Sequence, residues 1–473
     1  MTQPESGQVA PPTPQSTPRP HRRLGPIVTA GFAAAVGVWS AWFITHLPWL
    51  GMSERISIPL LLAVWLAMAI LGPRIAGVDP RRTSPVFGAG AGVVAAILGL
   101  LILGSKLGEH APGFEALRPS AALMALGFII LGAVIGAIGS GLASFLPAPL
   151  AAPREQGHWL SRLAIVACVA VAPLLFVGGL VTSTDSGMAV PDWPNTFGSN
   201  MFLYPLGPRA QPNVYLEHSH RLFGTLVGLA TLSLMIGVYR NDDRRWVRRW
   251  AIVAFALVCI QGILGGVRVT ENSRLLAMVH GVLAQILFAA LVALAVFLAP
   301  AYRAMVARLA ASAPPEITPD LQPTLRRLRF LATGAAHVTI LQLVFGAMYR
   351  HFRSDHALWT HAVFSVVVVI LAVAAGFAAM AVPQTLGRVG RIVRAAGKGV
   401  LLTVGVQFVL GWIAFGAGGR EHEAATILQA LIRTVHQANG ALLLALTTML
   451  YMWTRPLAPR TLIAPQPTAP VQT

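Results

Sequence analysis

The chain has 473 residues, of which 55% are hydrophobic and only 11% are charged, and its mean hydropathy is +0.67. This balance excludes an ordinary soluble domain and indicates an all-α polytopic membrane protein. The formal net charge of +18 does not indicate nucleic-acid binding, because the arginines lie in short segments between apolar runs, where membrane topology places them.

Twelve apolar runs are long enough to cross a bilayer as helices. We expect them near residues 27–46, 56–76, 85–104, 121–146, 161–182, 217–239, 248–269, 276–299, 328–349, 359–382, 399–417 and 430–452. Arg and Lys are concentrated in the connections on one side, which predicts a cell-membrane protein with both termini in the cytoplasm.

The last eight of these runs repeat a pattern of small residues, which indicates two related units. Gln-x-x-x-Gly occurs three times and a glycine pair twice, each near the outer end of a run. These motifs are Gln261/Gly265, Gln342/Gly346, Gln407/Gly411, Gly178-Gly179 and Gly265-Gly266. We therefore expect two pseudo-repeated four-helix bundles preceded by four extra helices.

These patterns divide the chain into seven parts. They are a disordered cytoplasmic tail (1–25), a four-helix membrane module (26–147), a linker (148–160), a first four-helix unit (161–299), a cytoplasmic linker (300–327), a second four-helix unit (328–453) and a disordered tail (454–473).

Four histidines lie at one depth, in the outer third of alternate runs. They are His220, His280, His361 and His436. A single histidine in a membrane helix is more often structural, but two per bundle at a shared depth suit axial ligands on opposite sides of a porphyrin iron. The sequence therefore predicts one pair in each unit, with metal sites towards the outer face.

Glu217 distinguishes the first expected site from the second. It precedes His220 by one helical turn, and no acidic residue stands three positions before the other three histidines. Only the first site therefore has a candidate proton acceptor. Arg221, four residues after Glu217, is expected to pair with it.

The segment between the fifth and sixth runs, residues 183–216, is rich in Trp, Pro and Phe. Because stiff, apolar loops can cover a ligand and exclude water, we expect a lid over the first site, with Asp192 and Trp193 as supporting residues. We expect His218 to be interfacial. We also expect His351 and His356 in a short outer loop where cationic groups meet haem propionates.

These residues resemble the haem A synthase family of CtaA-type cytochrome oxidase assembly proteins. The resemblance covers about residues 161–453 and rests on an ordered set of motifs. They are Gly178-Gly179, Ser186-Gly187, Pro191-Asp192-Trp193-Pro194, Glu217 to Arg221, and the single histidines His280, His361 and His436. Many family members also carry a cysteine pair beside the Pro-Asp-Trp-Pro segment, where this chain has Val190 and Thr196.

The resemblance implies oxidation of the C8 methyl group of haem O to a formyl group, giving haem A for cytochrome c oxidase. It implies that His220 and His280 hold the substrate haem O, that His361 and His436 hold a haem b cofactor, and that Glu217 is catalytic. Haem O synthase, other oxidase assembly proteins, the lipid bilayer and further copies of the chain are the partners it suggests. The alternatives are a di-haem b-type electron carrier without enzymatic activity and a proton-coupled transporter.

Overall fold

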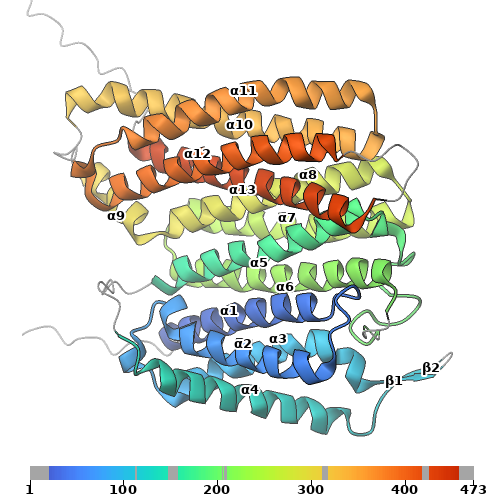
Figure 1. Ribbon diagram of the computed structural model, residues 1–473. Helices are drawn as coiled ribbons and strands as arrows, with labels where there is room; N and C mark the ends of the chain where they lie inside the picture. Colours follow the sequence, from blue (N-terminus) through green and yellow to red (C-terminus); the bar gives the residue numbers. More distant parts are fainter. Residues whose placement is uncertain are drawn as a thin grey trace, which may run out of the picture.

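The structure, a computed structural model, describes residues 21–111, 114–147, 158–204, 206, 210–311, 318–417 and 425–457. Long helices lie side by side and make up almost all of it, as Figure 1 shows. They are α1 (His21–Thr45), α2 (Glu54–Ile75), α3 (Pro85–Leu107), α4 (Ala121–Ala143), α5 (His158–Ser183), α6 (Pro212–Asn241), α7 (Arg245–Thr270), α8 (Arg274–Leu298), α9 (Pro300–Ala311), α10 (Gln322–Phe352), α11 (Asp355–Met380), α12 (Gly387–Gly416) and α13 (Ile427–Leu457). A hairpin, β1 (Gly108–Ala111) and β2 (Phe114–Leu117), and the short turns η1 (Pro80–Arg82), η2 (Ser186–Met188), η3 (Pro319–Leu321) and η4 (Gln384–Leu386) complete it.

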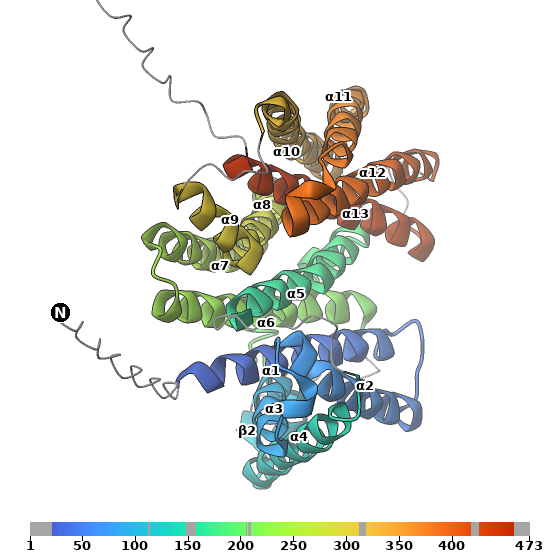
Figure 2. The same cartoon turned by 90° about the vertical axis from the view of Figure 1, so that its left-hand side faces the viewer.

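Three groups of four helices lie in a row, as the end-on view in Figure 2 shows. In the first bundle α5 packs on α6 and α8, and α7 closes the ring between them; α10, α11, α12 and α13 form the second bundle in the same way. The expected pair of four-helix bundles is thus confirmed. The bundles meet where α13 contacts α5 and α8 and where α10 contacts α8.

Eleven of the described helices have the length and hydropathy of a membrane span, so the chain is a multi-pass membrane protein. Of the twelve expected spans, only α13 falls outside this set. It is 31 residues long, but His436, Gln437 and Asn439 interrupt its apolar run and lower its mean hydropathy. Its length and its place inside the second bundle are those of the twelfth expected span.

Three of the four helices that carry the histidines, α8, α11 and α13, begin with side-chain caps, which fix how far into the helix each histidine lies. Ser273 accepts from the Leu276 amide before α8, and Ser354 accepts from the Ala357 amide before α11. His280 and His361 each follow their cap by seven residues, which is two turns. At α13, Thr426 and Gln429 form a reciprocal capping box.

The amino-terminal module, α1 to α4, packs directly on the first bundle through α1. The Tyr215 hydroxyl on α6 donates to the Phe43 carbonyl at 2.8 Å, and the two rings stack with centroids 5.6 Å apart. Trp39 meets Phe223 edge to face at 5.9 Å. The module therefore covers the back of the helix that carries Glu217 and His220.

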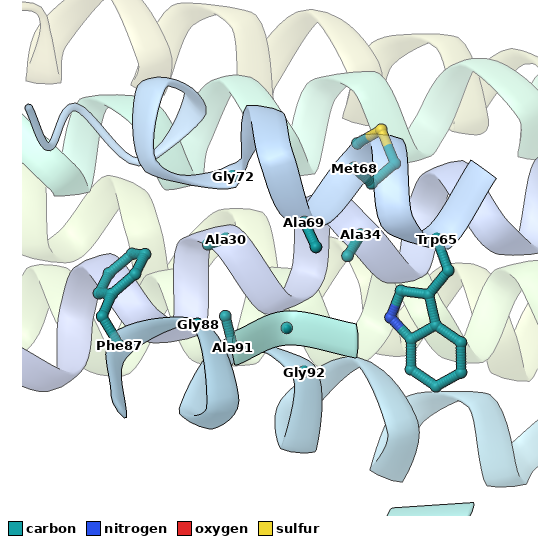
Figure 3. A pocket seen from close by; sticks show the side chains of 11 residues that line it. Ala30, Ala34, Trp65, Met68, Ala69, Gly72, Phe87, Gly88, Ala91 and Gly92 are labelled. Atoms are coloured by element: carbon teal, nitrogen blue, oxygen red, sulfur yellow. The ribbon is translucent and has the colours of Figure 1, made fainter. Parts of the chain in front are cut away.

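Within the module, small residues let the helices approach closely. A side chain at Gly88 or Gly92 on α3 would collide with the α4 backbone. The hollow that remains lies among α1, α2, α3 and α4, with Trp65, Met68 and Phe87 at its rim (Figure 3). Its lining holds no ionisable group, so it belongs to this packing.

Asp242 fastens the opposite end of the first bundle, at the turn between α6 and α7. Its buried carboxylate accepts from the Arg244 side chain at 2.7 and 2.9 Å, and Arg244 also donates to the Phe297 carbonyl on α8. Burial alone would raise the pKa of Asp242, but the hydrogen bonds from Arg244, with the charges of Arg244 and Arg303, hold it below its usual value.

Several expected boundaries were wrong, because helices continue through polar turns that an apolar run does not include. The expected tail 1–25 overlaps α1, which begins at His21, and the tail 454–473 overlaps α13, which ends at Leu457. The linker 300–327 contains α9 and the start of α10, and α5 begins at His158, inside the linker 148–160. The remaining expectations for residues 1–20, 148–157 and 458–473 fall outside the described part of the chain.

Candidate functional site

The structure places the four candidate histidines in two facing pairs, one in each bundle. The ring centroids of His220 on α6 and His280 on α8 are 6.2 Å apart, with planes at 79°. Those of His361 on α11 and His436 on α13 are 6.4 Å apart, at 78°. The helices that carry them all start at the same end of the molecule (Figure 1). The two bundles thus present nearly the same arrangement.

A glycine on the neighbouring helix lies against each imidazole. A Cβ added at Gly178, Gly265 or Gly346 would lie 2.8 to 2.9 Å from the Cε1 atom of His220, His280 or His361, respectively, and one at Gly411 would lie 3.4 Å from Cε1 of His436. A side chain at Gly178, Gly265 or Gly346 would displace the ring, so these three glycines are required for the position of the histidine, whereas a Cβ at Gly411 would only come into ordinary contact with it. We call Gly178, Gly265, Gly346 and Gly411 the seat glycines.

The recurrent glutamine also contacts the histidine helix. Gln261 donates to the His280 carbonyl at 2.7 Å and Gln342 to the His361 carbonyl at 2.9 Å. The side-chain nitrogen of Gln407 instead lies 3.2 Å from the ring nitrogen Nε2 of His436. The side-chain nitrogen of Asn439 donates to the side-chain oxygen of Gln407 at 2.8 Å. In the Gln-x-x-x-Gly motif the glutamine therefore contacts the histidine or its helix, and the glycine leaves space for the imidazole ring.

In each glycine pair the second glycine contacts a group outside the seat. The Trp193 indole of the loop packs on Gly266, and Thr434 of the second bundle packs on Gly179. The first glycine of each pair receives a histidine of the first bundle. The same short motif therefore holds the ligand side chain on one side and an external neighbour on the other.

Glu217 is buried beside the first pair, and both of its carboxylate oxygens have partners. Oε1 accepts from Arg221 at 2.8 Å, and Oε2 accepts from the Val190 amide at 2.8 Å. A carboxylate offers about four lone-pair positions, so it retains capacity for a proton or a further donor. The expected Glu217–Arg221 ion pair is present.

Arg221 joins this carboxylate to the preceding loop. Its guanidinium donates to the carbonyls of Val190, Asp192 and Asn195 at 2.8 to 2.9 Å. The Asp192 carboxylate accepts from the amides of Phe197 and Gly198, which closes the turn. The described residues of the loop are therefore fastened to the amino-terminal part of α6, at Glu217 and Arg221.

Two of the expected histidine environments were wrong. His218 is not interfacial: it is buried beneath the loop, with Nδ1 3.2 Å from the Thr196 hydroxyl. His351 lies in the last turn of α10 and His356 in the first turn of α11, so neither occupies a loop. The loop fold over His218 and the longer helices were not apparent from local hydrophobicity.

A buried contact between the bundles lies beside the two sites. Arg350 on α10 donates to the Gly179 carbonyl at 3.0 Å and to the Ser183 hydroxyl at 2.6 Å, both on α5. Ser183 is in turn 3.2 Å from the Thr434 hydroxyl on α13, two residues before His436. The second bundle thus contacts the glycine next to the seat of His220.

The donor set fits a haem in each bundle. Metal–imidazole bonds are about 2 Å long, and the ring centre lies about 1 Å further out, so two imidazoles on one iron have centres about 6 Å apart. The observed centroid distances of 6.2 and 6.4 Å agree with this. The buried Nδ1 atoms of His220 and His280 have no hydrogen-bond partner among the described residues, and the described groups of His, Cys, Asp and Glu hold no cluster of three or more. Paired ligands of this kind match an iron whose equatorial positions a porphyrin fills.

Sequence reasoning missed three contributors to this region: the Val190 amide, the Tyr215 contact with α1, and Arg268 at the end of α7. The first two depend on the loop and on helix docking, which leave no local pattern. Arg268 did carry a signal, because it is a charged residue three positions after a seat glycine at the end of an apolar run.

Comparison with known proteins gives a consistent set of similarities. The family model COX15-CtaA, described as cytochrome oxidase assembly protein, matches residues 161–358. This stretch contains the first bundle, α10 and the start of α11. It includes His220, His280 and Glu217, and ends shortly before His361.

Curated relatives extend the same similarity. The chain is 32% identical over 138 residues to the haem A synthase of Shouchella clausii (strain KSM-K16), covering 28% of this chain and 44% of the relative. It is 27% identical over 237 residues to the haem A synthase of Rhodopseudomonas palustris (strain BisB5), covering 42% of this chain and 58% of the relative. The chain thus spans about half the length of the curated relatives it matches.

Proposed function

We propose that this chain makes haem A from haem O, because its residues 161–358 match the family model of cytochrome oxidase assembly proteins and its curated relatives include haem A synthases. In this proposal the C8 methyl group of haem O is oxidised to a formyl group. The observation that carries the proposal is the pairing of equivalent histidines in two bundles, with a buried carboxylate beside only the first pair among the described residues.

The two pairs receive different roles. His220 and His280 would hold the substrate haem O, and His361 and His436 would hold a resident haem b that supplies one-electron chemistry when bound. Oxidation of a methyl group releases protons together with electrons. Glu217 is the acidic residue one turn from His220, so it is assigned as the group that accepts protons.

The surrounding residues position Glu217 and exclude water. Arg221 and the Val190 amide hold its two oxygens, while the loop fastened through Asp192 covers the outer end of α6. Trp193 packs on Gly266, beside the seat of His280, so the same loop contacts α6, which supplies His220, and α7, which carries the seat of His280. We assign Arg221, Asp192 and Trp193 as supporting residues of the first site.

The proposal includes an orientation in the membrane. The arginine-rich ends of α6, α7 and α12 lie opposite the ends where the histidines lie, and positive residues favour the cytoplasmic side. Both termini are therefore assigned to the cytoplasm and the haem sites to the outer half of the cell membrane. Haem O synthase, other assembly proteins and further copies of the chain are the proposed partners.

Chromatography of extracted haems tests the activity. Membranes containing the chain are supplied with haem O, and the haems are separated by reverse-phase chromatography beside a Glu217→Ala variant. Haem A, or an intermediate hydroxylated on the same carbon, should appear with the parent chain alone. Stable binding of haem b without any conversion of haem O would refute the proposed reaction.

A di-haem electron carrier is the second candidate, and one observation favours it. Both oxygens of Glu217 are already engaged by protein donors, which suits a structural carboxylate as well as a reactive one. A carrier would bind the same haem in both bundles and would lose nothing but stability on replacement of Glu217. The extraction experiment separates the two functions.

A further inference from the structure

Arg268 lies close to the first histidine pair and has few hydrogen-bond acceptors among the described residues. It lies in the last turn of α7, three residues after the seat glycine Gly265. Its Nη2 donates to the Gly187 carbonyl at 3.3 Å, and a Cβ at Gly187 would lie 2.9 Å from that nitrogen. No described carboxylate lies within ion-pair distance, and no other hydrogen bond of this side chain is found in the described part of the chain.

Arg221, on the adjacent helix α6, is an arginine whose guanidinium donors are well supplied with hydrogen-bond acceptors. Arg221 donates to three backbone carbonyls and to the Glu217 carboxylate. Arg268 has the same five N–H donors and uses one of them. The guanidinium of Arg268 therefore packs on the loop glycine Gly187 and keeps N–H donors that have no partner among the described residues.

The position of Arg268 relates it to the reacting groups. Its charge interacts with Glu217, His220 and His280. Arg268 is partly buried, and partial burial of a cation carries a desolvation cost that a paired anion offsets, but Glu217 already pairs with Arg221. The anion that pairs with Arg268 is therefore expected to be a group of the ligand that binds at this site.

We propose that Arg268 binds a propionate carboxylate of the porphyrin in the first bundle and thereby determines which edge of the ring faces Glu217. This inference rests on the proposed function. Guanidinium groups bind carboxylates through charge-assisted hydrogen bonds, and their planar fork favours one orientation. In haem O the two propionates lie side by side on the porphyrin rim, and the C8 methyl group is the direct neighbour of one of them. A propionate held beside Glu217 therefore turns the edge of the ring that carries this methyl group towards the carboxylate, and Arg268 acts as a specificity-determining residue for that edge.

Binding of zinc protoporphyrin IX and of its dimethyl ester tests this role without turnover. The ester keeps the ring and the metal but has no carboxylate charge. The full-length chain would carry His361→Ala and His436→Ala, so that the second bundle offers no histidine of this pair to the zinc, and porphyrin fluorescence would report binding to the first site. Arg268→Gln is compared with Arg274→Gln, which removes the same charge from an exposed position at the same end of the bundle.

The parent should bind the free acid about ten- to a hundredfold more tightly than the ester, the range of one charge-assisted hydrogen bond. Arg268→Gln should remove most of this preference, Arg268→Lys should retain part of it, and Arg274→Gln should leave it intact. A full preference in Arg268→Gln, or equal binding of acid and ester by the parent, would overturn the role of Arg268 while leaving the haem site in place. Failure of the parent to bind either porphyrin would instead count against the proposed function itself.

Discussion

The seat glycines make a sharp test of the paired histidine sites, and Gly265 is the best placed. A Cβ at this position would lie 2.9 Å from Cε1 of His280, whereas ordinary contact begins near 3.4 Å, so the ring must withdraw by 3.4 − 2.9 = 0.5 Å. This is a quarter of a metal–imidazole bond of about 2 Å. Gly265→Ala should therefore break or tilt the axial bond at the first site.

The same helix provides a matched control. Gly262 has no atom within 4 Å of its hypothetical Cβ, so Gly262→Ala should stabilise α7 by up to about 1 kcal/mol. Optical and electron paramagnetic resonance spectra of haem-loaded protein would report the ligation. Gly265→Ala should convert the first haem from six-coordinate low spin to five-coordinate high spin and leave the second unchanged. If both variants retain the parent spectrum, His280 does not ligate iron from the observed position.

Three further predictions concern single side chains. Glu217→Ala should retain bound haem but slow conversion of haem O by about 10²- to 10⁴-fold in the extraction assay, and Glu217→Gln, which still accepts from Val190, should be equally slow if a base is needed. His361→Ala should remove one haem, counted by the pyridine haemochrome method, and spare the signal of the first site. Because the pKa of Asp242 is depressed by Arg244, its contribution to stability is complete above the unfolded value near pH 4 and is lost as the pH falls through the folded pKa. Asp242→Asn should therefore lower the unfolding temperature at pH 7, by the equivalent of about 1–3 kcal/mol of unfolding free energy. In acid the variant and the parent should unfold at the same temperature. An equal difference in unfolding temperature at every pH would contradict the assignment.

The membrane made the helical plan predictable. Each span had to be long and apolar, and the recurrence of glutamine, glycine and histidine at fixed intervals followed from one packing arrangement used again in each bundle. The partners His220 with His280 and His361 with His436 could be paired in advance, because diagonally opposite helices of a four-helix ring direct side chains towards each other across the shared core.

Features that depend on long-range contacts could not be predicted in this way. The burial of His218 depends on a loop that returns over α6 and places Thr196 beside the ring. The contact of Tyr215 with Phe43 joins residues far apart in the chain, and neither residue type marks it. Polar first turns hid the true starts of α6 and α10, since hydropathy reports the membrane core and not the length of the helix.

The packing of α1 on the first bundle restricts the directions from which an apolar ligand could reach the first histidine pair. The module covers α5 and α6, and the second bundle covers α5 and α8. In the described part of the chain, α7 alone in the first bundle packs closely on no helix from outside it, and its outward residues, such as Ile252, Ile260 and Ile263, are exposed. A porphyrin travelling within the lipid layer therefore meets the first site from one side, past the helix that also carries Gly265 and Arg268.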